Sequence, residues 1–276
     1  MGVEYPQAFA ALHWLCSSIL EQFGCIPRPT YSVVCSVSLL WIRKNGILRG
    51  VTVLQPVRVL HVFARMNRGG AETMIMNLYR ATDRSKVQFD FIVHTDQECE
   101  FDNEIRNMGG RIFKVPAYTG KNHFRYVKSW HEFFRDYPEY SIIHGHARST
   151  ASIYLQVAKR YGLSTIAHSH NTSSGRGFSA IVKNILQYPV RYIADYLFAC
   201  SEHAGQWLFG KTACKNGNFY IINNAIDAQA FAFSRKVRDE KRRNLGLTGK
   251  FVVGHIGRFH PQKNHEFLID IFEVLH

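Results

Sequence analysis

The sequence lacks the features that mark several classes of protein. None of its six cysteines forms a C-x-x-C pair, so a cysteine-built zinc site is not predicted, and a chain this long and apolar needs no disulfide staples. The apolar stretch at residues 31–42 is only 12 residues long, short of the ~20 that cross a bilayer. The first residues carry Glu4 and no basic segment, which argues against a secretory signal peptide.

Acidic residues are few relative to basic ones. The 21 Asp and Glu residues against 34 Lys and Arg residues give a formal net charge of +13. Such a field attracts anionic partners such as nucleotide-sugars, phospholipid surfaces or nucleic acid. The basic residues are scattered and form no motif of a known nucleic-acid module, so no nucleic-acid partner is expected. We expect a cytoplasmic protein, for which peripheral contact with an anionic membrane at its inner face stays open.

Regular structure is predicted to begin at Val57. Residues 1–56 show no sustained period of 2 or 3.6, so we predict a poorly ordered extension. Beyond them, strand patterns alternate with helical ones, which predicts an α/β fold with a parallel sheet and helices on both faces. The predicted strands are residues 57–63, 89–93, 111–115, 141–145, 165–168, 196–199 and 219–222, and the predicted helices are residues 71–80, 101–108, 126–135, 149–161 and 180–194, the last kinked at Pro189.

A second unit of the same kind is predicted near the end of the sequence. Residues 236–248 are charged and predict a solvated linker helix, after which residues 251–256 restart the strand pattern. We therefore divide the sequence into an extension, a first α/β domain, a linker helix and the start of a second domain. These are residues 1–56, 57–235, 236–250 and 251–276.

A double glycine, Gly69-Gly70, separates the first predicted strand from its helix. Such a turn lets backbone N–H groups approach a ligand and directs a helix N-terminus at an anion. It does not match the G-x-G-x-x-G fingerprint, so a nicotinamide cofactor is not predicted. The alternative is a tight turn that needs glycine for a positive φ angle, and the double glycine alone favours that alternative.

Two histidine pairs, His144/His146 and His168/His170, stand at the ends of predicted strands, and Asn171 follows the second. A spacing of two places both side chains of a pair on one face of a strand. Each pair offers a metal two neighbouring ligands by itself, and no carboxylate or thiolate stands at ligand spacing from either pair. No metal site is therefore predicted. The carboxyl ends of strands in open α/β sheets bind ligands, where a histidine can contact a sugar. The alternative for any one of these four histidines is a loop residue whose ring is hydrogen-bonded within the protein and has no role in binding.

Two cations follow the last predicted strand. Arg258 comes directly after Gly257, and Lys263 precedes Asn264. A guanidinium fork and an ammonium group on one loop before a helix can neutralise a diphosphate. The alternative, two merely exposed basic residues, is weaker because cations at a helix N-terminus are unfavourable without an anion.

In their order and spacing these motifs resemble the retaining glycosyltransferases of family 4, whose GT-B architecture has two Rossmann-like domains facing a cleft. The resemblance covers residues 57–276 and looks most like the branch that builds bacterial capsular or exopolysaccharides. It implies the whole N-terminal domain and the start of the C-terminal one. It is carried by Val59-Leu60-His61-Val62, Gly69-Gly70-Ala71-Glu72-Thr73, Ile143-His144-Gly145-His146, His168-Ser169-His170-Asn171, Ala199-Cys200-Ser201, Ile222-Asn223-Asn224-Ala225-Ile226-Asp227 and Gly257-Arg258-Phe259 with Lys263-Asn264.

The resemblance also implies roles for the site residues. His170 would lie near the reacting sugar as the catalytic residue. The double glycine would lie against the phosphates of a nucleotide-sugar donor, and the two cations would grip its diphosphate. Cations and helix N-termini can stabilise the leaving diphosphate without a metal, so no cofactor is expected. The implied donor- and substrate-binding residues are Gly69, Gly70, Glu72, His146, Asn171, Arg258 and Lys263.

The sequence departs from the family pattern at both ends. It stops before the Glu-x₇-Glu segment that holds the nucleotide ribose and donor sugar in the family, and residues 1–56 match nothing in it. We therefore expect a truncated glycosyltransferase, whose parent activity transfers a hexose-type sugar to a glycan or lipid-linked acceptor, with negligible activity by itself. The second hypothesis is a non-catalytic module that binds an acceptor or a partner chain. The third is a basic membrane- or nucleic-acid-binding protein.

Overall fold

A computed structural model of the chain describes residues 55–173, 175, 177–257, 259 and 263–275. The predicted extension, residues 1–56, lies outside the described residues except for its last two positions. The chain divides into two compact units at the boundary between Ile226 and Asp227. Each unit is described by itself.

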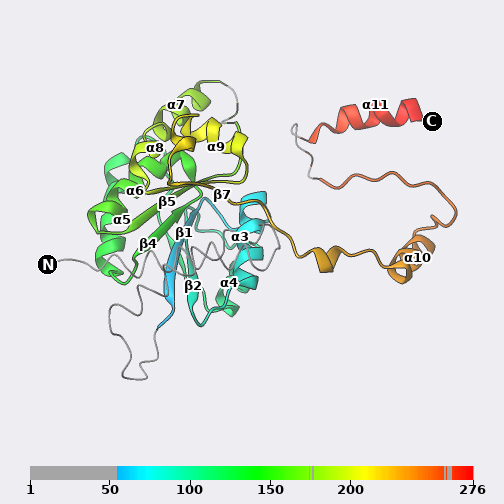
Figure 1. The fold of residues 1–276 in the computed structure, drawn as a ribbon, viewed down its shortest axis with the longest axis horizontal. Coiled ribbons are helices and arrows are strands. Elements are labelled where there is room, and N and C mark those ends of the chain that lie inside the picture. The colour runs from blue at the N-terminus through cyan, green and yellow to red at the C-terminus, as the bar shows by residue number, and fades with distance from the viewer. Residues whose placement is uncertain (1–54, 174, 176, 258, 260–262, 276) are drawn as a thin grey trace. The chain divides into compact units, whose positions relative to one another are not determined.

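The first unit is a seven-stranded sheet with the order β3-β2-β1-β4-β5-β6-β7, and every neighbouring pair is parallel (Figure 1). The predicted Rossmann-like α/β fold is therefore confirmed. The chain runs outward from β1 to β3 and then returns to place β4 on the other side of β1. This reversal makes the β1–β4 boundary the switch point of a doubly wound sheet. The strands are β1 (Val57–Phe63), β2 (Val87–Val93), β3 (Ile112–Lys114), β4 (Ile142–Gly145), β5 (Ser164–Ser169), β6 (Tyr196–Ala199) and β7 (Phe219–Ile221).

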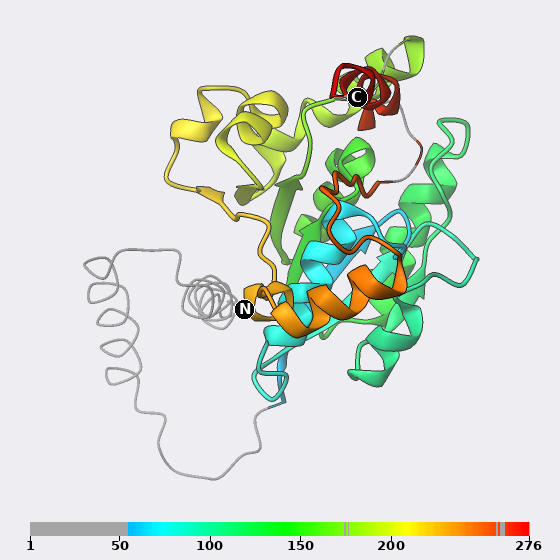
Figure 2. The same ribbon diagram turned by 90° about the vertical axis from the view of Figure 1, so that its right-hand side faces the viewer.

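Helices cover both faces of this sheet (Figure 1, Figure 2). Alternation along β1 divides the core between the faces: Val59 packs with Met74 and Ile75 of α3, whereas Leu60 packs with Trp130 of α5 and Tyr154 of α6. The helices are α3 (Gly70–Ala81), α4 (Asp102–Asn107), α5 (His123–Asp136), α6 (Ala151–Arg160), α7 (Phe178–Gln187), α8 (Val190–Ile193) and α9 (Glu202–Phe209), with 3₁₀ turns η2 (Arg148–Thr150) and η3 (Ala213–Lys215).

The helices of the first unit differ from the prediction at two places. The kinked helix over residues 180–194 is two helices, α7 and α8, with Pro189 as the N-cap of the second, because proline lacks the N–H that would continue the first. Helix α9 was not predicted. Its N-cap is Ser201, whose Oγ accepts a hydrogen bond from the Ala204 N–H at 3.2 Å. A serine directly after a strand is an N-cap signal that the sequence does contain.

The second unit contains the 3₁₀ turn η4 (Ala228–Phe231), α10 (Arg235–Asn244) and α11 (His265–Leu275). Helix α10 confirms the predicted charged helix, although it ends at Asn244. The predicted strand at residues 251–256 is wrong, because these residues form no strand. A strand is held by hydrogen bonds to a neighbouring strand, and the described part of this unit has none to offer.

The structure also bears on the membrane question. Among the described residues, no helix combines the length and the apolar character needed to cross a bilayer. The predicted domain boundaries at residues 235 and 250 stay predictions.

Candidate functional site

The predicted site residues of the first unit come from three loops at one edge of the sheet. Gly69 and Gly70 follow β1, His146 follows β4, and His170 and Asn171 follow β5. Strands β1, β4 and β5 are consecutive in the sheet and parallel, so their carboxyl ends lie at the same edge. These residues therefore stand at the carboxyl ends of the strands, the edge at which open α/β sheets bind ligands; their roles at a ligand stay predictions.

The double glycine starts α3. Gly69 is its N-cap in an extended conformation, with φ −100° and ψ 170°, and neither Gly69 nor Gly70 has a positive φ angle. The alternative of a left-handed turn is therefore wrong. A Cβ atom at Gly69 would lie 2.1 Å from Oε2 of Glu72, whereas one at Gly70 would meet no atom within 4 Å. Gly69 thus makes room for the Glu72 carboxylate, and Gly70 leaves the helix N-terminus open to an approaching group.

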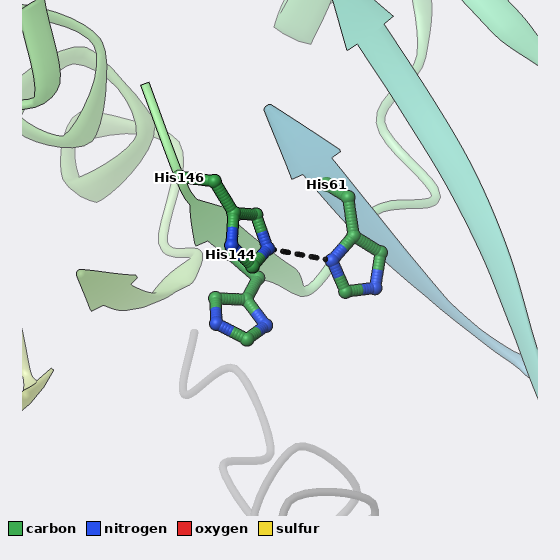
Figure 3. A group of neighbouring side chains, drawn as sticks. All are labelled: His61, His144 and His146. Carbon is green, nitrogen blue, oxygen red and sulfur yellow. Dashed lines mark hydrogen bonds between the residues drawn. The ribbon is translucent and has the colours of Figure 1, made fainter. Parts of the chain in front are cut away.

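The two histidine pairs lie in one cluster together with His61 of β1. Figure 3 shows His61 and His146 joined by a hydrogen bond of 3.1 Å between Nδ1 and Nε2, with the ring of His144 beside them. His146 Nδ1 lies 2.7 Å from His170 Nε2, and His144 Nε2 lies 3.1 Å from His168 Nδ1. The premise that each pair acts only locally is therefore wrong.

Strand register brings this cluster together. His61 on β1 is directly opposite His144 on β4, and β4 pairs in turn with β5, which carries His168. Neighbouring residues on parallel strands present their side chains on the same face. As a result, two groups of three histidines have ligand nitrogens within 4.8 Å of one another: His61, His144 and His146, and His146, His168 and His170.

Burial keeps the cluster uncharged. It lowers the pKa of His61 to about 3 and that of His170 to about 4, where the nearby Arg148 cation also contributes. It holds the pKa values of His144, His146 and His168 well below their usual range. At pH 7 each ring is therefore neutral, with one N–H donor and one lone pair.

Arg148 is a site residue that the sequence analysis did not single out. It starts η2, two residues beyond His146, and its guanidinium lies 4.8 Å from the ring centroid of Trp207 on α9. It donates hydrogen bonds to the side-chain oxygen of Asn171 and to the carbonyl of Ser173. A basic residue just beyond a strand's carboxyl end is the signal that could have found it. Arg148 supplies the positive charge beside a neutral His170.

Three predicted site residues remain: Asn171, Arg258 and Lys263. Asn171 is exposed and holds Arg148 through the hydrogen bond described above. Lys263 is exposed on the segment that leads into α11, and Asn264 follows it with a φ angle of 47°. Arg258 lies outside the described residues. Lys263 belongs to the second unit, so its role at the diphosphate stays a prediction.

Comparison with known proteins decides the family. The sequence profile described as Glycosyltransferase Family 4 matches residues 68–230, which is more than half of the chain. The chain belongs to glycosyltransferase family 4. The matched range contains Gly69, Gly70, Glu72 and both histidine pairs, and it ends before Lys263.

Relatives of the chain agree with that assignment. It is 39% identical over 221 residues to the putative glycosyltransferase EpsF of Bacillus subtilis (strain 168), covering 78% of this chain and 57% of the relative. It is 22% identical over 224 residues to the capsular polysaccharide biosynthesis glycosyltransferase CapH of Staphylococcus aureus, covering 79% and 58%. The chain thus spans less than three fifths of the length of these relatives.

Solved structures show the same fold. Anabaena HepE in complex with UDP matches this glycosyltransferase with a TM-score of 0.60 at 19% identity, over 78% of this chain and 57% of HepE. HepE in complex with UDP-glucose matches with a TM-score of 0.60 at 18% identity, over 77% and 56%. At these identities the comparison supports the fold alone, and the fold is that of the sheet described above.

Proposed function

We propose that this glycosyltransferase contributes to transfer of a sugar from a nucleotide-sugar to a glycan or lipid-linked acceptor in polysaccharide biosynthesis, with retention of configuration and without a metal at the reacting sugar. The observation that carries the proposal is the open N-terminus of α3 at Gly70, at the same sheet edge as His170 and Arg148. The printed names of EpsF and CapH, and the UDP and UDP-glucose bound to HepE, support the donor and product classes.

The donor phosphates are proposed to lie against the first turn of α3. The positive end of the helix dipole and the backbone N–H groups of the first turn attract an anion there. Gly70 offers the space, because a Cβ atom at this position would point into a region without protein atoms within 4 Å. Lys263 and Arg258 of the second unit are proposed to hold the diphosphate as it leaves, when its negative charge increases.

His170 is proposed to contact the reacting sugar. Because its pKa is lowered to about 4, it acts at pH 7 as a neutral hydrogen-bonding group and not as a cation. Its Nε2 faces His146, which fixes the orientation of the ring. Arg148 beside it is proposed to balance the charge that develops on the leaving group.

Transfer by the 276-residue chain alone is proposed to be negligible. Positioning the donor against the acceptor can lower the activation barrier by ~7–11 kcal/mol. The second unit is poorly organised to position a donor. Its helix α11 leaves Phe267 58%, Phe272 43% and Leu275 65% exposed, and the described residues of this unit form no strand. The competing function is a non-catalytic, acceptor-binding module.

The test joins this chain to a donor-side domain. We suggest a chimera in which the part of Bacillus EpsF beyond the matched region follows the first unit, assayed for release of nucleoside diphosphate from a panel of nucleotide-sugars. Acceptor-stimulated release by the chimera, and none by the chain alone, is expected. Chimeras that fold and bind glycan acceptors but never release nucleoside diphosphate would favour the binding module instead.

A matched pair of variants tests the phosphate position. Gly70→Val fills the space before α3, and Gly217→Val makes the same change at a second glycine where a Cβ atom meets nothing within 4 Å. Gly217 precedes β7, at the amino-terminal edge of the sheet and far from the proposed site. The chimera with Gly70→Val should lose UDP binding in calorimetry while Gly217→Val keeps it. Equal affinities would refute the phosphate assignment.

A further inference from the structure

The histidine cluster has more buried nitrogen atoms than its hydrogen bonds use. Its five rings have ten nitrogen atoms, and three hydrogen bonds use six of them. The four ring nitrogens left over are buried without a partner: His61 Nε2, His144 Nδ1, His168 Nε2 and His170 Nδ1. Leaving such groups unsatisfied is unfavourable, so the cluster is built for something besides packing.

The geometry around His146 resembles a ligand set. His61 Nδ1 and His146 Nε2 are 3.1 Å apart, close to the ~3.3 Å that separates two nitrogens on a tetrahedral zinc ion with bonds of ~2.0–2.1 Å. His144 is the third member, since one nitrogen from each of the three lies within 4.8 Å of the others. The Nδ1 atom of His144 has no hydrogen-bond partner and is therefore available as a ligand.

The other two histidines stand where supporting residues are found in metal sites. A metal-bound histidine usually donates its second N–H to a neighbouring acceptor, which fixes its tautomer. His146 can donate from Nδ1 to His170 at 2.7 Å, and His144 can donate from Nε2 to His168 at 3.1 Å. Both hydrogen bonds use the other nitrogen of each ring and leave His144 Nδ1 without a partner, and an ion between His146 Nε2 and His61 Nδ1 would replace the hydrogen bond that joins them.

We propose that His61, His144 and His146 bind a divalent transition-metal ion, with zinc as the expected occupant. Imidazole nitrogen is a favoured ligand of zinc, and three protein ligands leave a fourth position for water. The ligands come from β1, from β4 and from the residue that follows β4, so the ion links the two strands at the switch point and stabilises the sheet. The proposal goes beyond the transfer reaction, because the ion is not assigned to the reacting sugar.

The experiment uses the full 276-residue chain, free of affinity tags and stripped of metal. Titration with zinc chloride in a calorimeter should show one ion per chain. Zinc at a hundredfold excess over its dissociation constant should raise the melting temperature by about 5–10 °C, since binding to the folded state alone stabilises it. Cobalt(II) in place of zinc should give the visible absorption bands of a tetrahedral nitrogen site.

Variants identify the ligands. His61→Phe removes both nitrogens while keeping a ring beside Phe89 and Phe91, whose centroids lie 4.4 and 5.5 Å from that of His61. This variant and His144→Phe should lose stoichiometric zinc binding and the shift in melting temperature. The control His203→Gln replaces an exposed histidine on α9 and should keep both.

Three outcomes overturn the proposal. One is a wild-type chain that binds no zinc with defined stoichiometry. Another is a His61→Phe variant that keeps the full thermal shift, which would place any ion elsewhere. X-ray absorption of the zinc-loaded wild type provides the third measurement even if both variants fail to fold. It should show nitrogen neighbours at ~2.0–2.1 Å, and sulfur at ~2.3 Å would assign the ion to cysteine instead.

Discussion

Acidification should unfold the first unit through its buried histidines. Besides the five rings of the cluster, His94 is held neutral: burial lowers its pKa to about 4, and its Nε2 lies 2.9 Å from the Tyr126 hydroxyl. Six histidines are therefore neutral in the folded unit and take up protons when the chain unfolds at acid pH. They are His61, His94, His144, His146, His168 and His170.

The sign follows from proton linkage. An unfolded histidine has a pKa of about 6.5, above the lowered values in the folded unit, so the unfolded state binds more protons at acid pH. Stability is therefore fully present above about pH 6.5 and falls as the pH decreases toward the folded values. The Arg148 cation beside His170 acts in the same direction, whereas the buried Asp90 carboxylate opposes it slightly at His61.

The magnitude is large because the six contributions act together. At pH 5.5 each unfolded histidine carries about 0.9 proton and each buried one almost none, so unfolding takes up about five protons. That corresponds to a slope of roughly 7 kcal/mol per pH unit. Typical domains are stable by only ~5–15 kcal/mol. We therefore expect unfolding within one to two pH units below 6.5, before most carboxylates titrate.

The assay is urea unfolding of the metal-stripped chain at closely spaced pH values between 8 and 5, followed by near-ultraviolet circular dichroism. His61→Phe should reduce the proton uptake at pH 5.5 by about one, and the exposed-site variant His203→Gln should leave it unchanged. An uptake below two protons in the wild type would refute the neutral buried cluster and with it the proposed account of the site.

Three further predictions concern single side chains. Asp90→Asn should destabilise the first unit by ~3–5 kcal/mol in urea unfolding, because the fully buried Asp90 carboxylate accepts hydrogen bonds of 2.5 and 2.6 Å from Arg58 and one of 2.6 Å from Tyr140; a loss below 1 kcal/mol would contradict this. Ser201→Ala should cost ~0.5–2 kcal/mol by removing the N-cap of α9, and Ser201→Asp should restore most of it. Arg148→Ala in the EpsF chimera should weaken UDP binding by ~1.5–3 kcal/mol in calorimetry, and unchanged affinity would remove Arg148 from the donor site.

The fold was largely predictable because its signals are local. Most strands of the sheet contain a short β-branched or apolar run, and most are followed by turn residues and a helical period. The error at residues 251–256 shows the limit of such signals. Those residues have the composition of a strand, but a strand depends on a partner elsewhere in the chain, and composition carries no information about whether that partner is there.

The sequence indicated which loops carry the candidate site but not how their side chains lie. The favoured explanation of the double glycine, a positive φ angle, is wrong: Gly69 accommodates the Glu72 carboxylate and Gly70 faces open space. His61 was not predicted as a site residue because it lies inside an apolar strand. Only the register between β1 and β4, which joins positions 83 residues apart, sets it opposite His144.

The positive charge at this edge of the sheet lies outside the histidine cluster. Five histidines suggest an abundant source of positive charge for an anionic donor, but burial keeps all five neutral at pH 7. Among the groups assigned to the proposed site in the first unit, attraction for phosphates therefore comes from Arg148 and the N-terminus of α3. A donor held through these two groups should bind with little dependence on pH between 6.5 and 8, whereas a donor held by protonated histidines would bind more tightly as the pH falls through this range. Measuring UDP affinity across that interval separates the two cases.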